Sequence, residues 1–367
     1  MPDFLRATID VLLGIGLLFG GGELFVQGSV ALALVFGIPQ LVIGLTVVSL
    51  GTSAPELFVS LSSVFKGSDA LAVSNAVGSN IFNVMVVLGA SALVLPLRVE
   101  SRLVRRDIPL LIAISAAVWG MASAGRMTWQ AGVALLVGLV INTIWEIRTA
   151  REQPDVSVDA EPEVDANAGQ GGWGLAVFKL IAGIAVLTIG SRVLVSGAIT
   201  AATLLGVSEA VIGLTIVSAG TSTPELITSM VAALRGRTDL AIGNVVGSCL
   251  LNLTLVLGGG ALAAGSRGLL VSADLIHDDL PVMLLTSLAC LPIFWTNGRI
   301  SRVEGGLLLG LYLLYVIDNI LPRTSMASWA DEFRLVMLCL VIPAVMVIIV
   351  IQALLYWKGA QRVSRDS

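Results

Sequence analysis

Long apolar stretches alternate with short polar segments along almost the whole chain. A helix needs about 20 apolar residues to cross the hydrocarbon core of a bilayer. The pattern therefore predicts an all-α polytopic membrane protein with eleven membrane-spanning helices. Their approximate bounds are 8–33, 38–65, 70–95, 107–124, 127–147, 175–204, 208–234, 239–264, 279–296, 303–321 and 334–357.

Lysine and arginine are distributed unevenly over the predicted loops. Of the 21 basic residues, 14 fall on one side of the membrane and six on the other, with Arg192 inside a predicted span. Cytoplasmic loops of membrane proteins are enriched in basic residues. We therefore expect the N-terminus outside the cell and the C-terminus in the cytoplasm.

Composition narrows the functional classes. The chain is 56% hydrophobic and 13% charged, with a net charge of −4, whereas a soluble domain would be about a quarter charged. This composition predicts a protein surrounded by lipid and argues against nucleic-acid binding. The three cysteines lack metal-ligand spacing, and His277 is the single histidine. No zinc-type site is therefore expected.

Two segments of the chain are copies of each other. Residues 42–89 and 211–258 align without a gap at an offset of 169, and 25 of the 48 positions are identical. Five predicted spans separate corresponding helices, and this odd number places the copies upside down relative to each other. Inverted repeats are a transporter architecture, with the substrate site near the middle of the membrane where the copies meet.

The repeat divides the chain into parts. We expect two inverted-topology repeats of five transmembrane helices, in residues 1–150 and 175–322, and one extra C-terminal transmembrane helix in residues 333–357. Residues 151–174 are polar and acidic and contain proline and glycine, which is typical of a flexible cytoplasmic linker. Calcium sensing by the linker is an alternative, but the spacing of ligands in a calcium-binding loop is absent.

Glu56 and Glu225 occupy equivalent positions near the middle of a predicted span in each copy. A charged side chain at that depth costs about 2.5–3.5 kcal/mol on insertion scales. Such residues persist where they face a cavity or bind a cation. The alternative is a pair of structural acids satisfied by their neighbours, but identical acids in two inverted copies are hard to explain by packing.

Further oxygen-bearing residues share a helix face with these acids or follow the same four-residue spacing. The pairs are Thr52 with Glu56 and Ser79 with Asn83 in the first copy, and Thr221 with Glu225 and Ser248 with Asn252 in the second. The ligands are all oxygen, which suits hard cations such as calcium and sodium. Because both cations need the same two carboxylates, occupancy by one disfavours the other, which is a basis for exchange.

Pro55 and Pro224 directly precede the acids. A proline inside a helix removes an amide donor and displaces the carbonyl four residues earlier, which falls at Gly51 and Gly220. Because freed carbonyls in a membrane need partners, we expect these two to face a bound cation. A kink without ligation is the alternative.

At these residues the chain resembles the cation/calcium exchanger superfamily, in particular prokaryotic sodium/calcium exchangers. The matching motifs are Gly51-Thr-Ser-Ala-Pro-Glu56 with Gly78-Ser-Asn-Ile-Phe-Asn83, and Gly220-Thr-Ser-Thr-Pro-Glu225 with Gly247-Ser-Cys-Leu-Leu-Asn252. The resemblance covers residues 1–322. It implies a ten-helix fold in a prokaryotic inner membrane and alternating access by sliding of the first and sixth helices.

The resemblance also implies a role for each matched residue. Glu56 and Glu225 would ligate the ions directly, and Thr52 and Thr221 would offer backbone carbonyls to calcium. The flanking sodium sites would use Ser53, Ser79, Ser222 and Ser248, with Asn83 and Asn252 at the centre. Asn252 stands where potassium-dependent relatives carry aspartate, so potassium co-transport is not expected.

Glu23 and Arg192 lie inside the first and sixth spans, at equivalent places in the two copies. One hypothesis is that they pair or line the gate between the mobile helices. The alternatives are snorkelling and separate structural contacts. The acids near span ends, which include Asp107, Glu146 and Asp318, are expected to be interfacial rather than ligands.

The leading functional prediction is a secondary antiporter that exchanges calcium for sodium, with no cofactor and no enzymatic activity. Calcium/proton exchange through the same two glutamates is the runner-up, because protons compete for buried carboxylates. A channel fits kinked inverted repeats less well, and no nucleophile–base pair or phosphate loop indicates an enzyme. The expected partners are calcium and sodium ions, protons in the runner-up, and the lipid bilayer; no oligomeric state is predicted.

Overall fold

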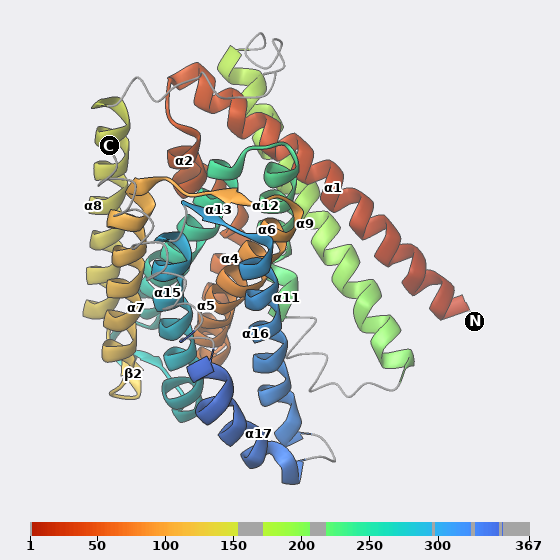
Figure 1. The fold of residues 1–367 in the computed structure, drawn as a ribbon, viewed down its shortest axis with the longest axis vertical. Helices are drawn as coiled ribbons and strands as arrows, with labels where there is room; N and C mark the ends of the chain where they lie inside the picture. Colours follow the sequence, from red (N-terminus) through yellow and green to blue (C-terminus); the bar gives the residue numbers. More distant parts are fainter. Residues whose placement is uncertain are drawn as a thin grey trace, which may run out of the picture.

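The computed structural model describes residues 2–152, 172–205, 218–295, 298–323, 327–344 and 347. In these ranges the chain is all-α apart from four two-residue strands (Figure 1). Before the linker the helical elements are α1 (Pro2–Phe36), α2 (Gln40–Ile43), η1 (Gly44–Val48), α3 (Ser49–Thr52), α4 (Ala54–Phe65), α5 (Asp69–Phe82), η2 (Asn83–Val87), α6 (Leu88–Val94), η3 (Leu103–Asp107), α7 (Ile108–Ala122) and α8 (Trp129–Glu152). After it they are α9 (Gly172–Leu204), α11 (Ser218–Thr221), α12 (Thr223–Leu234), α13 (Thr238–Leu251), η6 (Asn252–Val256), α14 (Leu257–Ala264), η7 (Gly265–Arg267), η8 (Leu275–Asp279), α15 (Leu280–Trp295), α16 (Arg302–Ile320), η9 (Leu321–Arg323), η10 (Ala327–Trp329), α17 (Ala330–Val336) and η11 (Met337–Val341).

The helices confirm an all-α membrane protein. In the described ranges, seven helices are long and apolar enough to cross a membrane, and the pair Gln40–Thr52 and Ala54–Phe65, bent by 44°, would be an eighth. The predicted span 107–124 corresponds to α7, a helix of 15 residues that follows the π-helical turn η3. The predicted spans 208–234 and 334–357 and the linker 151–174 lie partly outside the described residues.

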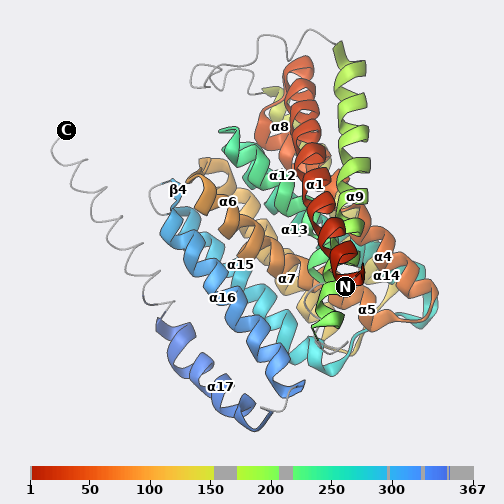
Figure 2. The ribbon, with the colours of Figure 1, turned by 90° about the vertical axis from the view of Figure 1, so that its right-hand side faces the viewer.

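Two pairs of short antiparallel strands lie at opposite ends of the bundle (Figures 1 and 2). β1 (Leu97–Arg98) pairs with β4 (Arg299–Ile300), and β2 (Arg126–Met127) pairs with β3 (Leu269–Leu270). Each pair joins a loop that precedes the linker to a loop that follows it. The distribution of basic residues predicts the same side of the membrane for both loops of a pair, as the pairing requires. We call the two ends of the bundle the β1–β4 end and the β2–β3 end.

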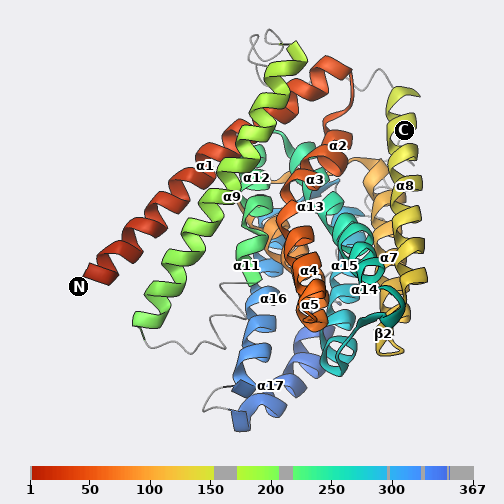
Figure 3. The same ribbon diagram turned by 180° about the vertical axis from the view of Figure 1, so that it is seen from behind.

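α1 and α9 lie side by side and antiparallel along one face of the bundle (Figure 3). Glycines recur every seventh residue at their contact, at 14, 21 and 28 in α1 and at 183, 190 and 197 in α9. A methyl group on Gly183 would lie 2.7 Å from the backbone nitrogen of Phe25, and one on Gly14 would lie 2.6 Å from that of Leu194. The missing side chains allow close approach, so the two helices form one tightly packed pair.

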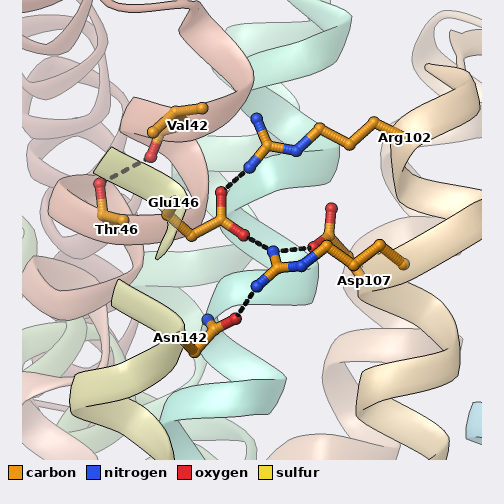
Figure 4. Close-up of polar contacts among 7 residues, drawn as sticks. Val42, Thr46, Arg102, Asp107, Asn142 and Glu146 are labelled. Carbon is orange, nitrogen blue, oxygen red and sulfur yellow. Dashed lines mark hydrogen bonds and ion pairs between the residues drawn. The ribbon is translucent and has the colours of Figure 1, made fainter. Parts of the chain in front are cut away.

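A buried ion network ties α8 to η3 at the β1–β4 end. The carboxylate of Glu146 accepts hydrogen bonds from Arg102 on one oxygen and from Arg106 on the other (Figure 4). Arg106 also lies 2.8 Å from a carboxylate oxygen of Asp107 and donates to the side-chain oxygen of Asn142. Because buried charges need opposite charges and hydrogen bonds, Glu146 and Asp107 serve the structure at the end of the bundle and lie apart from the predicted site.

α17 packs beside α16 at the β2–β3 end (Figure 2). Arg334 of α17 lies 3.3 Å from a carboxylate oxygen of Asp318 and 3.4 Å from one of Asp278. These ion pairs connect the start of the predicted extra helix to the end of α16 and to η8. Both are partly exposed, so each contributes little to stability.

Candidate cation site

In each copy a helix is interrupted at a serine, and the predicted acid lies in the first turn of the helix that follows. Glu56 is the third residue of α4 and Glu225 is the third residue of α12, and both side chains are completely buried. Ser53 and Ser222 precede these helices in a non-helical conformation. The N-terminus of a helix carries partial positive charge, so the local backbone stabilises a carboxylate at each position.

Each carboxylate is held by the opposite copy. Ser222 Oγ donates to Glu56 Oε1 at 3.0 Å, and Ser53 Oγ donates to Glu225 Oε1 at 3.2 Å. The acids and the breaks therefore form one crossed arrangement in the interior of the bundle. Both side chains therefore face the interior of the bundle and not lipid.

Asn75 is a residue of this centre that the sequence analysis missed. Its side-chain nitrogen donates to the backbone carbonyl of Glu56 at 3.1 Å and to Ser60 Oγ at 3.0 Å. Its side-chain oxygen accepts a hydrogen bond from Thr221 of the other copy at 3.3 Å. Asn75 thus links the helix that carries one acid to the break that precedes the other.

Asn244 makes the same contacts in the second copy, at an offset of 169. Its side-chain nitrogen donates to the carbonyl of Glu225 at 3.3 Å and to Ser229 Oγ at 2.9 Å, and its oxygen accepts from Thr52 at 3.0 Å. Both asparagines are identical in the aligned repeat. That identity was the available signal for them.

The structure brings the other predicted residues to the same centre. Ser79 Oγ lies 2.9 Å from Ser222 Oγ, and Ser248 Oγ lies 3.5 Å from Thr52 Oγ1. Asn83 and Asn252 follow one helical turn later, where each begins a π-helical turn. Nine of the ten predicted site residues are buried, and Thr221 is half-buried.

Several buried polar atoms at this centre have no hydrogen-bond partner among the described protein groups. They are Oε2 of Glu56, Oε2 of Glu225, and the side-chain oxygen and nitrogen of both Asn83 and Asn252. Buried polar groups are nearly always hydrogen-bonded, and such orphans cluster at functional positions. The four oxygens can coordinate a hard cation.

One expected ligand is engaged elsewhere. The carbonyl of Gly220, four residues before Pro224, accepts a hydrogen bond of 2.5 Å from Ser191 Oγ of α9. A hydroxyl of the neighbouring helix therefore occupies one lone pair of this carbonyl, and a cation would not be its sole partner. Ligation by the carbonyls of Gly51 and Gly220 stays a prediction. The equivalent of Ser191 in the first copy is Gly22, which has no hydroxyl to offer Gly51.

The hypothesis that Glu23 pairs with Arg192 was wrong. Glu23 binds Arg235 at the end of α12, with Arg235 Nη2 2.7 Å from Oε1 and Nε 3.0 Å from Oε2. Glycine packing aligns α1 with α9 so that Glu23 faces α12.

The polar atoms on the two glutamates at this centre that lack a partner among the described residues are oxygens. Over the part of the chain that the structure describes, no three His, Cys, Asp or Glu side chains gather at metal-binding distance. The candidate site instead combines two carboxylates with hydroxyl, amide and backbone oxygens, which suits calcium and sodium better than zinc or copper.

Two inverted helices, each broken beside a buried acid and joined at one oxygen-rich centre, define a membrane cation transporter. The chain belongs to the sodium/calcium exchanger family. The family model, described as sodium/calcium exchanger protein, matches residues 7–148 and 175–321. This membership confirms the resemblance drawn from the motifs and supports cation/calcium antiport.

Individual relatives are similar over most of their length. The chain is 37% identical to the putative antiporter CaxA of Alkalimonas amylolytica, over 85% of this chain and 98% of that protein. It is 30% identical to the sodium/calcium exchanger MaX1 of Methanosarcina acetivorans, over 84% and 96%. The solved structure of the sodium-calcium exchanger NCX_Mj soaked with 10 mM Na+ and zero Ca2+ has a TM-score of 0.70 and 31% identity, and the match covers 85% of this chain and 98% of that one.

Proposed function

We propose that this protein exchanges calcium for sodium by alternating access through the centre between α4 and α12. The observation that carries the proposal is the crossed pair of buried carboxylates whose Oε2 atoms have no partner among the described protein groups. Two negative charges balance one calcium ion or about two sodium ions. Alternate occupancy by the two ions would then couple their fluxes.

The proposal assigns roles to the surrounding oxygens. Glu56 and Glu225 ligate both ions, and the backbone carbonyls of Thr52 and Thr221 complete the calcium site. Sodium ions use hydroxyls on either side, from Ser53, Ser79, Ser222 and Ser248. Asn83 and Asn252 lie at the centre and contribute neutral oxygens, which leaves the two glutamates as the acids of the site.

The proposal also includes an orientation and a division of the chain. The β1–β4 end is cytoplasmic, because its loops carry the excess of basic residues. Residues 1–150 and 175–322 are the two inverted repeats, 151–174 the linker and 333–357 the extra transmembrane helix.

Calcium uptake into proteoliposomes under imposed sodium, proton or potassium gradients tests the function. We expect uptake into sodium-loaded vesicles and its loss in Glu56→Gln and in Glu225→Gln. Glu332→Gln, at an exposed position of α17, is the matched control and should transport normally. Uptake driven by a proton gradient without sodium would replace the proposal with calcium/proton exchange, and near-normal uptake by both site variants would remove the site assignment.

A further inference from the structure

The two copies differ in how the α1/α9 pair packs on them. On the second copy, α1 covers α12, and Gly22 of α1 faces Ile227 and Val231 of α12. Ile227 is 9% exposed, whereas Phe58, its equivalent at an offset of 169 on α4, is 71% exposed. Among the described residues, α9 makes no comparable contact with α4. The pair thus occupies one of two positions that the repeat makes equivalent.

A chain of polar contacts holds the pair in this position. Arg235 of α12 binds both oxygens of Glu23 in α1, at 2.7 and 3.0 Å. Gln27 donates to Glu23 at 2.8 Å and accepts from Lys179 of α9 at 3.0 Å. One carboxylate therefore connects both helices of the pair to α12.

The equivalent contact in the other position would join residues of like charge. At the offset of 169, Arg192 of α9 corresponds to Glu23, and Lys66 at the end of α4 corresponds to Arg235. Both Arg192 and Lys66 are exposed in the present structure. If α9 covered Phe58 as α1 covers Ile227, Arg192 and Lys66 would come together at the end of α4, and two cations would take the place equivalent to the present ion pair.

We propose that Glu23 and Arg235 form a latch that favours the present position of the α1/α9 pair, and that Arg192 and Lys66 disfavour the opposite one. The inference rests on the proposed exchange by alternating access, in which one structural unit rocks against another. Its physical basis is the difference between an attractive and a repulsive pair of exposed charges. The charges would bias which end of the bundle opens, whereas the conserved geometry of the two copies permits both.

Paired cysteines test whether the second position exists. In protein whose three native cysteines are replaced by alanine, a bifunctional thiol reagent with a reducible spacer should link Glu23→Cys to Arg235→Cys, and Lys66→Cys to Arg192→Cys. Each cross-link should stop exchange, and reversal should restore it. If the second pair never cross-links in protein that still exchanges ions, the mirrored position is wrong.

Spin labels at positions outside the latch test how its charges affect the position of the α1/α9 pair. Labels at Phe19→Cys in α1 and Leu313→Cys in α16, both exposed positions, should report two distances, one for each position of the pair. Exposed ion pairs contribute about 0.2–1 kcal/mol, so Glu23→Gln should change the ratio of the two populations by about 1.4-fold to fivefold. Arg192→Glu should change it in the same direction.

Two further variants make the test specific to the latch. The charge exchange Glu23→Arg with Arg235→Glu should restore the original ratio, and Asp10→Asn, elsewhere on α1, should leave it unchanged. A ratio that ignores Glu23→Gln, or that the charge exchange does not restore, overturns the latch. Two distances in protein that lacks sodium-driven calcium uptake would instead refute the proposed function and leave the latch standing.

Discussion

Replacement of Asn244 by leucine should strongly weaken calcium binding, because this side chain positions Glu225. Asn244→Leu keeps the branched shape and the number of side-chain heavy atoms but removes three hydrogen bonds, to Glu225, Ser229 and Thr52. At about 0.5–1.5 kcal/mol each, the loss is about 3 kcal/mol. If all of it acts on the geometry of the site, the half-saturating calcium concentration should rise about 100-fold.

Asn75→Leu is the matched variant, because Asn75 makes the same three contacts in the first copy. Asn75 is half-buried and lines a cavity with Ser79 and Tyr315, whereas Asn244 is completely buried. Water can replace lost partners only in the first case, so Asn75→Leu should raise the half-saturating concentration about tenfold or less. The assay is calcium-dependent uptake into sodium-loaded proteoliposomes, with thermal unfolding in detergent to separate binding from stability. Wild-type affinity in Asn244→Leu, or equal effects of the two variants, would refute the reasoning.

Asn252→Asp would add a third carboxylate to the site, so we expect a lower half-saturating calcium concentration and uptake that responds to potassium, measured by calcium flux with and without potassium. Gly183→Ala should lower the unfolding temperature, because the new methyl group would lie 2.7 Å from the Phe25 backbone and overpacking costs about 1–3 kcal/mol; Gly138→Ala, with no described atom within 4 Å of the new group, should not. Burial and the nearby charge of Asp239 raise the pKa of Glu100, which lies outside the spans, to about 7. A carboxyl whose pKa is raised in the folded protein stabilises the fold at pH below its unfolded pKa, and this stabilisation is lost as pH rises through the folded pKa. The unfolding temperature should therefore fall as pH rises to about 7. Glu100→Gln should flatten this dependence on pH.

The repeat made most of the centre predictable. The sequence identity of the two repeats and their inverted topology are enough to place Glu56 and Glu225 together. The contacts that cross between the copies, such as Ser53 with Glu225, could not be predicted, since they depend on how the breaks face each other. The assignment of these residues to calcium and sodium stays a prediction.

Partners far apart in the chain were the least predictable. Ser191 reaches the carbonyl of Gly220 because α9 packs against α11, and Glu23 finds Arg235 because α1 covers α12. Helix periodicity specifies which face of a helix is polar but not which helix it meets.

The crossed contacts carry a consequence for how the site can form. Ser222 of the second copy holds Glu56 of the first, and Ser53 of the first holds Glu225 of the second. Separated copies would each leave a buried carboxylate without its hydroxyl donor, at a cost of about 1–3 kcal/mol or more. The site therefore exists only where both copies meet, and a movement that separates the breaks would disrupt both acids together.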